Sequence, residues 1–480
     1  MTARSDTSCS AASHRTVRLH CKSLAMQIRP DALTQLFAQR PLPAILGGNE
    51  ADCQANRFGV WAAEPREVFE CSADEQRPLE RLQQEVSRYA LDAPGATDLP
   101  AGMFCGGWIG YFSYDLGRFI EKTPAVAVDD LHLPLIRLCF YDRAVCYDRL
   151  EQRWWLVALE MEEDVQLPRA KLDGLLHLLR EAQNAIVPAV GEGDLGAVDV
   201  SRTGCNMSRG AYFDALKRIR QYICDGDVYQ INFSQRFECA YDRSPIALYH
   251  WQNRYNASPY AAYIDAGRFS IISASPEMFL TVRDGRVSTQ PIKGTRRRLV
   301  WHPEAAVLNE ANFLELVRSE KEQAELNMII DLERNDLARI CVPGSRFVSQ
   351  PRTIETYPTV FHAVATVEGR LRPACSFTDI LRAVFPGGSI TGAPKIRAME
   401  IIDELEPTRR GVYTGSIGYI GLDGSVCLNI AIRTVIIAGG TAYAQTGGGI
   451  VADSEPEAEW EETITKARAL LAGIAAVQQS

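Results

Sequence analysis

The sequence lacks several patterns that identify common classes of site. It holds 13 cysteines in 480 residues, but no two of them form a C-x-x-C pair. Neither a zinc site of that kind nor a dithiol redox motif is therefore indicated. A chain of this length does not need disulfide staples, so we expect reduced thiols and a cytoplasmic protein. No run of about 18 apolar residues occurs, which argues against a membrane span.

The sequence also lacks an excess of basic residues. It has 51 Lys and Arg against 60 Asp and Glu, a net charge of -9. A nucleic-acid-binding protein would need a basic face, so nucleic acid is not expected as a partner. The hydrophobic fraction of 46% is ordinary for a globular protein. The length suggests two or three domains.

Composition divides the chain into four regions. Residues 1–25 are rich in Ser, Thr and Arg and have no apolar core of a secretory signal, which predicts a disordered extension. Residues 26–185 have the pattern of mixed strands and helices. Residues 186–204 are small and without aromatics, which is typical of a linker. Residues 205–475 show the clearest periodicity, and we expect the functional site there.

One lysine lies at a break in a predicted strand. Lys293 follows Pro291 and precedes Gly294 in the stretch 289–298, Thr-Gln-Pro-Ile-Lys-Gly-Thr-Arg-Arg-Arg. Proline removes a ladder donor, and glycine permits close approach of a backbone or ligand. A lysine at this place can be presented to a small molecule. Taken alone, the stretch also fits a basic turn on the surface.

A predicted hairpin brings a carboxylate close to this lysine. The Asp-Gly pair at 284–285 is a strong signal for a two-residue turn. The resulting pairing puts Glu277 within one rung of Lys293. Strict alternation would place the two side chains on opposite faces. Because Pro276 and Pro291 disfavour strict alternation, we predict a break in the ladder at one of them.

A second pair of predicted hairpins surrounds one arginine. With turns at 423–424 and 439–440, Arg433 falls on a middle strand, between Tyr413 on one side and Gly447 on the other. A buried arginine needs an anionic partner, and these strands supply no acid near it. A carboxylate ligand would serve, and so would an acidic residue from elsewhere in the fold.

The strand predicted over 228–237 has one apolar and one polar face. By alternation, Tyr229, Ile231, Phe233 and Phe237 face the core. Gln230, Asn232, Ser234 and Arg236 face the other way. A polar face without an acid is either solvated or one wall of a polar site.

Two predicted helices each carry a pair of glutamates three residues apart, and hence on one helical face. The pairs are Glu322 with Glu325 and Glu459 with Glu462. Each lies near a possible capping box, Ser319 with Glu322 and Ser454 with Glu457. All-oxygen ligation suits Mg²⁺, so the pairs could converge on one ion. For any single glutamate, a solvated helix face is the alternative.

Together these motifs resemble the chorismate-utilising enzymes, which include anthranilate, isochorismate, salicylate and aminodeoxychorismate synthases. The resemblance covers about residue 30 to the end. The matching segments are Ser275–Glu277, Gln290–Thr295, Asp331–Asp336, Gly387–Lys395 and Gly447–Ser454. It implies an α+β fold with two large antiparallel sheets packed face to face and helices on the outside. Lysine in Pro-Ile-Lys-Gly-Thr is typical of aminodeoxychorismate synthases, whereas anthranilate synthases carry alanine there.

The resemblance implies a role for each matching residue. Lys293 would be the nucleophile and Glu277 the general acid. The implied substrate-binding residues are Arg433, Tyr413, Gly447, Gly449, Gly294, Thr295, His362, Ser389 and Gln230. Glu325 and Glu462 would bind Mg²⁺ directly, and Glu322 and Glu459 through water. Gln230 stands where isochorismate and salicylate synthases place a lysine base, so activation of water from that side is not expected.

The resemblance also implies partners and leaves alternatives. Chorismate would be aminated with ammonia from a separate glutamine amidotransferase subunit, because the chain shows no glutaminase signature. The product would be 4-amino-4-deoxychorismate, for p-aminobenzoate and folate synthesis. The alternatives are anthranilate synthase component I and a non-catalytic chorismate-binding subunit. At 44–48 the chain has Ala-Ile-Leu-Gly-Gly in place of the Leu-Leu-Glu-Ser by which anthranilate synthases sense tryptophan.

Overall fold

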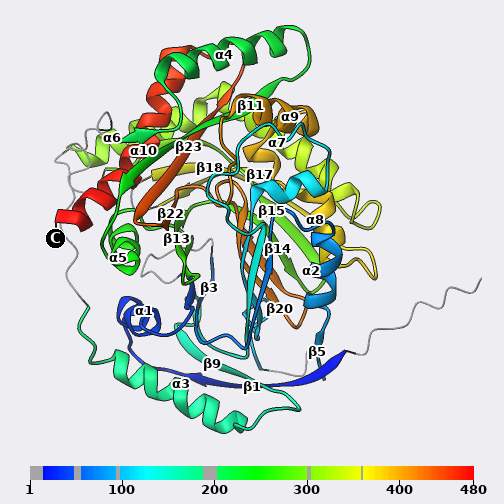
Figure 1. Cartoon of the computed structure of the whole chain (residues 1–480), viewed down its shortest axis with the longest axis vertical. Coiled ribbons are helices and arrows are strands. Elements are labelled where there is room, and N and C mark those ends of the chain that lie inside the picture. The colour runs from blue at the N-terminus through cyan, green and yellow to red at the C-terminus, as the bar shows by residue number, and fades with distance from the viewer. Residues whose placement is uncertain are drawn as a thin grey trace, which may run out of the picture.

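Two large β-sheets form the framework of the molecule, with helices on their outer sides (Figure 1). The structure is a computed structural model, and it describes residues 14–47, 56–92, 98–187, 200, 203–299, 304–357 and 360–479. Among the described strands every ladder is antiparallel except the one between β1 and β5. The predicted α+β architecture of two antiparallel sheets is confirmed.

The larger sheet has 13 strands. In order across the sheet they are β10 (Gly204–Cys205), β11 (Gln230–Ala240), β23 (Thr441–Ile450), β22 (Thr434–Ala438), β13 (Phe269–Ser275), β12 (Tyr260–Asp265), β2 (Ala44–Leu46), β3 (Phe58–Ala62), β8 (Arg143–Asp148), β9 (Arg153–Glu160), β1 (Arg15–Leu24) and β5 (Tyr89–Leu91), with β19 (Gly392–Ala393) paired to β11.

The smaller sheet has 10 strands. In order they are β16 (Ile292–Arg297), β18 (Val360–Arg370), β15 (Arg286–Gln290), β14 (Met278–Arg283), β21 (Val426–Asn429), β20 (Ser416–Gly421), β6 (Gly107–Phe112), β7 (Ile136–Tyr141) and β4 (Glu67–Cys71), with β17 (Phe347–Thr356) paired to β18.

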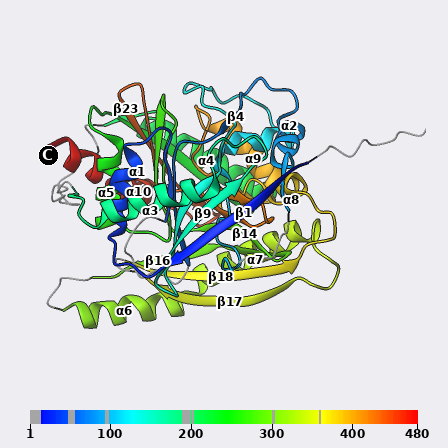
Figure 2. The same cartoon turned by 90° about the horizontal axis from the view of Figure 1, so that it is seen from below.

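Helices cover the outer face of each sheet. They are α1 (Pro30–Ala38), α2 (Pro78–Val86), α3 (Pro168–Ala182), α4 (Arg209–Cys224), α5 (Pro245–Tyr255), α6 (Ala305–Arg318), α7 (Glu320–Ala338), α8 (Phe377–Val384), α9 (Lys395–Leu405) and α10 (Pro456–Gln479), with short 3₁₀ helices η1 (Tyr114–Phe119) and η3 (Gly388–Ile390). Helices α1, α3, α5 and α10 pack on the larger sheet, and α2, α7 and α8 on the smaller one. Figure 2 shows α6 beside the long strands β17 and β18 at the margin of the smaller sheet. None of the described helices combines the length and the hydropathy that crossing a membrane requires.

Both sheets contain strands from either side of the predicted linker. β1 to β9 and β10 to β23 are distributed over the two sheets, and the division at 186–204 stays a prediction because most of that segment lies outside the described residues. The predicted N-terminal extension needs a correction. Residues 15–24, which were expected to be disordered, form β1, and this strand pairs with β9 over seven residue pairs. Val17 is buried and Leu19 and Cys21 are partly buried, whereas Arg18 and Lys22 are exposed, which is typical of a strand with one face on the protein.

Two of the three predicted hairpins have the expected register, and the third is shifted. β14 and β15 pair around 284–285 in the expected register, Val282 opposite Val287, until a bulge between Met278 and Thr281 shifts it by one residue. β22 and β23 also pair as expected. At 423–424 the pairing is one residue off, with Tyr419 opposite Cys427, because the turn is longer than two residues.

The chain passes twice from one sheet to the other at neighbouring places. Residues 276–277 connect β13 of the larger sheet to β14 of the smaller one, and residues 430–433 connect β21 back to β22. The crossings lie side by side: the Ile430 amide donates to the Glu277 carbonyl at 3.0 Å, and the Ala274 amide donates to the Arg433 carbonyl at 3.0 Å. A paired strand cannot continue through such a crossing, so side chains here are free to face a cavity.

Candidate active site

A cavity of about 780 Å³ opens beside the two crossings. Its wall is made by β11, β16 and β23, the crossings themselves, η3, and the first turns of α7 and α10. This volume suits a small polar metabolite. Every residue expected in the site lines the cavity except Gln230.

Lys293 reaches the cavity through a bulge in β16. The pairing of β16 with β18 shifts by one residue between Ile292 and Thr295, so Lys293 and Gly294 form the irregular part. Gly294 has φ +98°, and a Cβ there would lie 2.8 Å from Leu316 Cδ1 and 2.9 Å from Glu322 Oε2. Only glycine fits this position. The lysine ammonium donates to the Ser389 carbonyl at 3.3 Å.

Glu277 lies in the first crossing and faces the same cavity. Its side chain is 5% exposed. Its carboxylate accepts hydrogen bonds from the Ser389 side chain and the Ile292 amide, the residue before Lys293. The predicted break in the ladder is therefore present, as the crossing at Pro276 and the bulge in β14. Because of this break, Glu277 and Lys293 face the same cavity, whereas a regular ladder would have placed them on opposite faces of the sheet.

Burial favours the uncharged forms of both residues. It is the largest effect on Lys293 and lowers the pKa of its ammonium group, although Glu277 acts in the opposite direction. Burial likewise raises the pKa of the Glu277 carboxyl, although Ser389 and Lys293 oppose it. A neutral amine can act as a nucleophile, and a protonated carboxyl beside it can act as a general acid.

Arg433 is placed differently from the prediction. It is not on a middle strand but at the end of the second crossing, with φ +49°. Its side chain lines the cavity and has no ion pair or hydrogen bond with any described residue. Burial lowers the pKa of its guanidinium group. A partly buried cation that has no partner among the described residues is suited to bind an anion.

His362 and Thr295 form a hydrogen-bonded pair beside Lys293. Thr295 Oγ1 and His362 Nδ1 are 2.8 Å apart, and His362 Nε2 is buried with no hydrogen-bond partner in the part of the chain that the structure describes. Burial, followed by the charge of Arg433, lowers the pKa of His362 to about 3. The ring is therefore neutral, and its free nitrogen is available to a ligand.

Glycines of β23 let the backbone form one side of the cavity. A Cβ on Gly447 would lie 2.4 Å from the Phe233 carbonyl oxygen, and a Cβ on Gly449 would lie 2.2 Å from Gln230 Nε2. Tyr413, with 8% of its surface exposed, faces the same space. Gln230 lies behind Gly449 and is fully buried, and neither polar atom of its amide has a hydrogen-bond partner among the described residues.

The polar face of β11 is buried and forms a wall of the site. Asn232 and Ser234 line the cavity, and Asn232 Nδ2 donates to the Ser389 carbonyl at 3.0 Å. The apolar face is confirmed for Ile231, Phe233 and Phe237. Tyr229 is a correction: it is 71% exposed because the strand begins only at Gln230.

The four glutamates lie on two helices that face each other across the cavity. Glu322 and Glu325 come from α7, and Glu459 and Glu462 come from α10. The predicted capping boxes are incomplete. Ser319 caps the Glu322 amide, but the Glu322 side chain accepts from Arg296 Nη1 at 2.7 Å. Glu457, the expected partner of Ser454, instead pairs with Arg209. Ser454 Oγ donates to Glu459 Oε1 at 2.6 Å.

These carboxylates fit a divalent cation by chemistry and charge. Glu322 Oε2 is buried, and no residue within the described ranges forms a hydrogen bond with it. Burial is the largest effect on Glu325 and raises its pKa, and Glu322 and Glu462 act in the same direction. Oxygen ligands that repel one another gain most from a shared hard cation. Among the described residues no three His, Cys, Asp or Glu side chains already form a ligand cluster, and Lys466 donates to Glu462 Oε1 at 2.7 Å.

Three residues at the site were not predicted from the sequence: Lys466, Arg410 and Glu406. Lys466, one turn after Glu462 on α10, also donates to the Gly447 carbonyl at 2.7 Å. Arg410 and Glu406 form a buried ion pair at the base of the cavity. The i, i+4 spacing of Glu406 and Arg410 was a local signal for the pair, but nothing local placed it against β11.

Comparison with known proteins adds the family. Residues 48–472 match the model of the chorismate binding enzymes. The chain belongs to this family. It is thus a chorismate-utilising enzyme, and the cavity with Lys293 and Arg433 is its candidate active site.

The relatives carry two different names. The chain is 38% identical over 464 residues to aminodeoxychorismate synthase component 1 of Klebsiella aerogenes, covering 93% of this chain and 98% of that one. It is 36% identical over 493 residues to anthranilate synthase component 1 of Pseudomonas putida, covering 98% and 97%. The crystal structure of anthranilate synthase component I from Streptococcus pneumoniae matches with a TM-score of 0.73 at 31% identity, covering 87% of this chain and 93% of that one. The similarity is about equal to both kinds of relative, so it does not decide between the aminodeoxychorismate synthase and the anthranilate synthase reaction.

Proposed function

We propose that the protein is an aminodeoxychorismate synthase component I, which converts chorismate and ammonia to 4-amino-4-deoxychorismate. The observation that carries the proposal is Lys293, a lysine with a lowered pKa next to the carboxyl group of Glu277. A site that only positions ammonia against chorismate has no need of a second amine at the reacting ring. A nucleophilic lysine gives that amine a role.

The reaction proceeds by two displacements. The neutral amine of Lys293 forms a bond to C2 of chorismate as the ring double bonds shift and the C4–OH bond breaks, and Glu277 gives its proton to the departing hydroxyl, which leaves as water. Ammonia then forms a bond at C4, the double bonds shift back, and the bond from C2 to the lysine nitrogen breaks. Glu277 takes up a proton from the attacking ammonia, and Lys293 leaves as a neutral amine. Both residues thereby recover their starting forms.

The remaining residues hold the substrate. Arg433 pairs with one carboxylate of chorismate, with help from Tyr413 and the backbone at Gly447 and Gly449. His362 and Thr295 lie beside the ring, and Ser389 contacts both Lys293 and Glu277. Glu325 and Glu462, with Glu322 and Glu459, would hold Mg²⁺, which would neutralise the ring carboxylate.

The ammonia comes from a glutamine amidotransferase subunit. The relatives named above are each called component 1 or component I, a designation that implies a second component. With free ammonium in place of glutamine, the chain is expected to work alone.

The product formed from chorismate, Mg²⁺ and ammonium tests the proposal. Chromatography should show 4-amino-4-deoxychorismate, and no pyruvate should be released. Fluorescent anthranilate with an equal amount of pyruvate would overturn the proposal in favour of anthranilate synthase. Binding of chorismate without turnover would favour a non-catalytic subunit.

Removal of the cation from Arg433 is expected to affect substrate binding. In Arg433→Gln, the KM for chorismate should rise by about 30-fold or more, because a buried carboxylate loses its only charged partner, at a cost of about 2 kcal/mol or more. Turnover at saturation should change much less. Steady-state kinetics measure both, and Arg220→Gln on the exposed face of α4 is the matched control. An unchanged KM would contradict the role of Arg433.

The glutamates are expected to make activity depend on Mg²⁺. Chelation with EDTA should abolish turnover, and Mg²⁺ should restore it. In Glu325→Gln, the Mg²⁺ concentration for half-maximal activity should rise by about 10-fold or more, because an ionised ligand becomes a neutral one. Calorimetric titration with Mg²⁺ checks binding separately from turnover. Glu310→Gln on exposed α6 is the control, and equal Mg²⁺ requirements in the two variants would contradict the assignment.

A further inference from the structure

Arg410 is part of the base of the cavity and is almost completely enclosed. Its side chain is 2% exposed, like that of its ion-pair partner Glu406. Two hydrogen bonds join the pair, from Nε at 2.9 Å and from Nη2 at 2.8 Å. Glu406 is itself fixed to β11, since Ser234 donates to it from the amide at 2.9 Å and from the hydroxyl at 2.7 Å.

The other hydrogen bonds of Arg410 go to the backbone that carries the site. Nη1 donates to the Ile390 carbonyl at 3.0 Å and to Thr414 Oγ1 at 3.3 Å, and Nη2 donates to the Asn232 carbonyl at 2.6 Å. Ile390 directly follows Ser389 in η3. Arg410 therefore joins η3 to β11 at the point where both meet the cavity.

Ser389 is the residue that links the two reacting groups. Its carbonyl accepts from Lys293 at 3.3 Å and from Asn232 Nδ2 at 3.0 Å, and its side chain donates to Glu277. Ile390 follows Ser389 in the chain, and Asn232 is hydrogen-bonded to it. Arg410 donates to the backbone carbonyls of both residues. A shift of η3 against β11 would move Ser389, and with it the geometry of Lys293 and Glu277.

We propose that Arg410 is a positioning residue for the chemical step, acting through Ser389 on Lys293 and Glu277. The inference rests on the proposed function. A guanidinium has five N–H donors, and the five hydrogen bonds given above use each of them once. None is left for the substrate, so Arg410 acts on the site without binding chorismate by a hydrogen bond.

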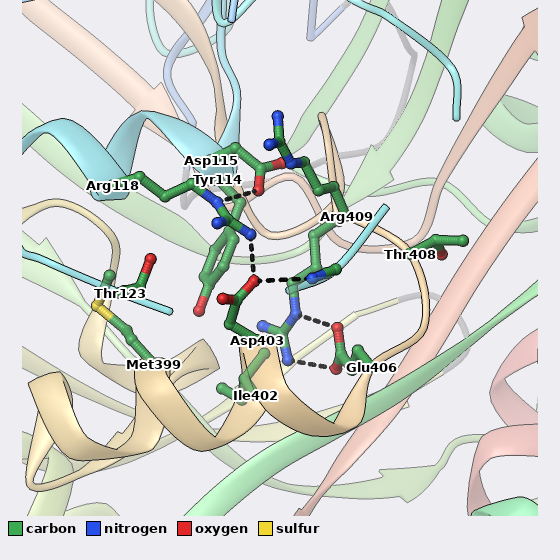
Figure 3. A pocket seen from close by; sticks show the side chains of 12 residues that line it. Tyr114, Asp115, Arg118, Thr123, Met399, Ile402, Asp403, Glu406, Thr408 and Arg409 are labelled. Atoms are coloured by element: carbon green, nitrogen blue, oxygen red, sulfur yellow. Dashed lines mark hydrogen bonds and ion pairs between the residues drawn. The ribbon is translucent and has the colours of Figure 1, made fainter. Parts of the chain in front are cut away.

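The surroundings explain why the position requires arginine. Behind the guanidinium lies a second cavity of about 20 Å³, room for about one water, bounded by η1, the end of α9 and Arg409 (Figure 3). The Tyr114 ring lies 4.7 Å from the guanidinium carbon. A lysine ammonium has three donors on a single nitrogen, so it cannot replace the five hydrogen bonds by which Arg410 joins Glu406, Ile390, Thr414 and Asn232.

The test separates turnover from binding. In Arg410→Lys, we expect kcat with chorismate and ammonium to fall by about 10²-fold, because a displacement of about 1 Å in a reacting group costs that much. KM for chorismate should change by less than about 3-fold, since substrate contacts are retained. Arg409→Lys is the matched control: it borders the same small cavity, pairs with Asp129 at 3.2 Å and does not line the active site.

A second variant covers the case in which a lone buried charge prevents folding. Arg410→Met combined with Glu406→Gln removes both charges, and it should show the same loss of kcat at nearly unchanged KM. A folded Arg410→Lys or double variant with kcat within about 3-fold of the parent would overturn the inference, as would a rise in KM that accounts for the whole loss. Turnover is measured as the amount of chorismate consumed, whatever the product. Wild-type protein that makes anthranilate would therefore reject the proposed function, and the effect of the Arg410 variants on kcat could still be interpreted.

Discussion

Replacing Lys293 with alanine should lower ammonia-dependent turnover of chorismate by at least about 10³-fold, on the scale of enzymes that lose a nucleophile. The expected cause is loss of the covalent step, since no other amine lies in the bulge of β16. The fold should survive, because Lys293 faces the cavity and its one direct hydrogen bond is to the Ser389 carbonyl. Stopped assays for 4-amino-4-deoxychorismate measure the effect.

Lys321→Ala is the matched control for charge. Lys321 lines the same cavity at the start of α7 and belongs to no step of the reaction, so its removal should change turnover by less than about 10-fold. A second measurement looks for the intermediate itself. Mass spectrometry of wild-type protein quenched with chorismate but no ammonia should show an adduct on Lys293 and none in Lys293→Ala. Normal turnover by Lys293→Ala would show that the lysine is not the nucleophile.

Local patterns predicted the parts of the fold that depend on local chemistry. The Asp-Gly pair at 284–285 fixed a two-residue turn, and the register followed from it as far as the bulge at Met278. The hairpin at 423–424 was displaced by one residue, since an Asp-Gly pair also occurs in longer turns.

The passage of the chain between sheets was not predictable from pairing alone. Residues 426–450 have the pattern of one continuous meander, yet β21 belongs to the smaller sheet and β22 to the larger. Nothing in the sequence around Arg433 marks the crossing, because a residue other than glycine with positive φ leaves no compositional signal. The crossing accounts for an unpaired cation where a central strand was expected.

The resemblance predicted the members of the site better than the patterns did. Residue types and spacing alone left Lys293 open to interpretation as a surface residue and each glutamate as part of a solvated face. The motifs of the family placed them together, and the cavity contains them. What the motifs did not supply is the support beneath, Arg410 with Glu406, because the packing of this ion pair against the distant strand β11 depends on the whole fold.

Glu277→Gln should lower kcat by about 10²- to 10⁴-fold, the range for loss of a general acid. It should also change the pH profile. In the wild type, the first step needs Lys293 without its proton and Glu277 with its own, so activity should rise and then fall with pH, with apparent pKa values that belong to the pair. Glutamine does not titrate, so the fall at high pH should disappear. The rise should remain, because burial still lowers the pKa of the Lys293 ammonium group.

The control for this variant is Glu368→Gln, which removes a carboxylate from β18 outside the cavity and should keep the bell-shaped profile. Comparing the two profiles separates the loss of an acid from the loss of a charge. Glutamine can still accept a hydrogen bond from Ser389 and from the Ile292 amide, so the crossing at 276–277 should keep its shape. A Glu277→Gln profile that still falls at high pH would assign the proton of the departing hydroxyl to another group.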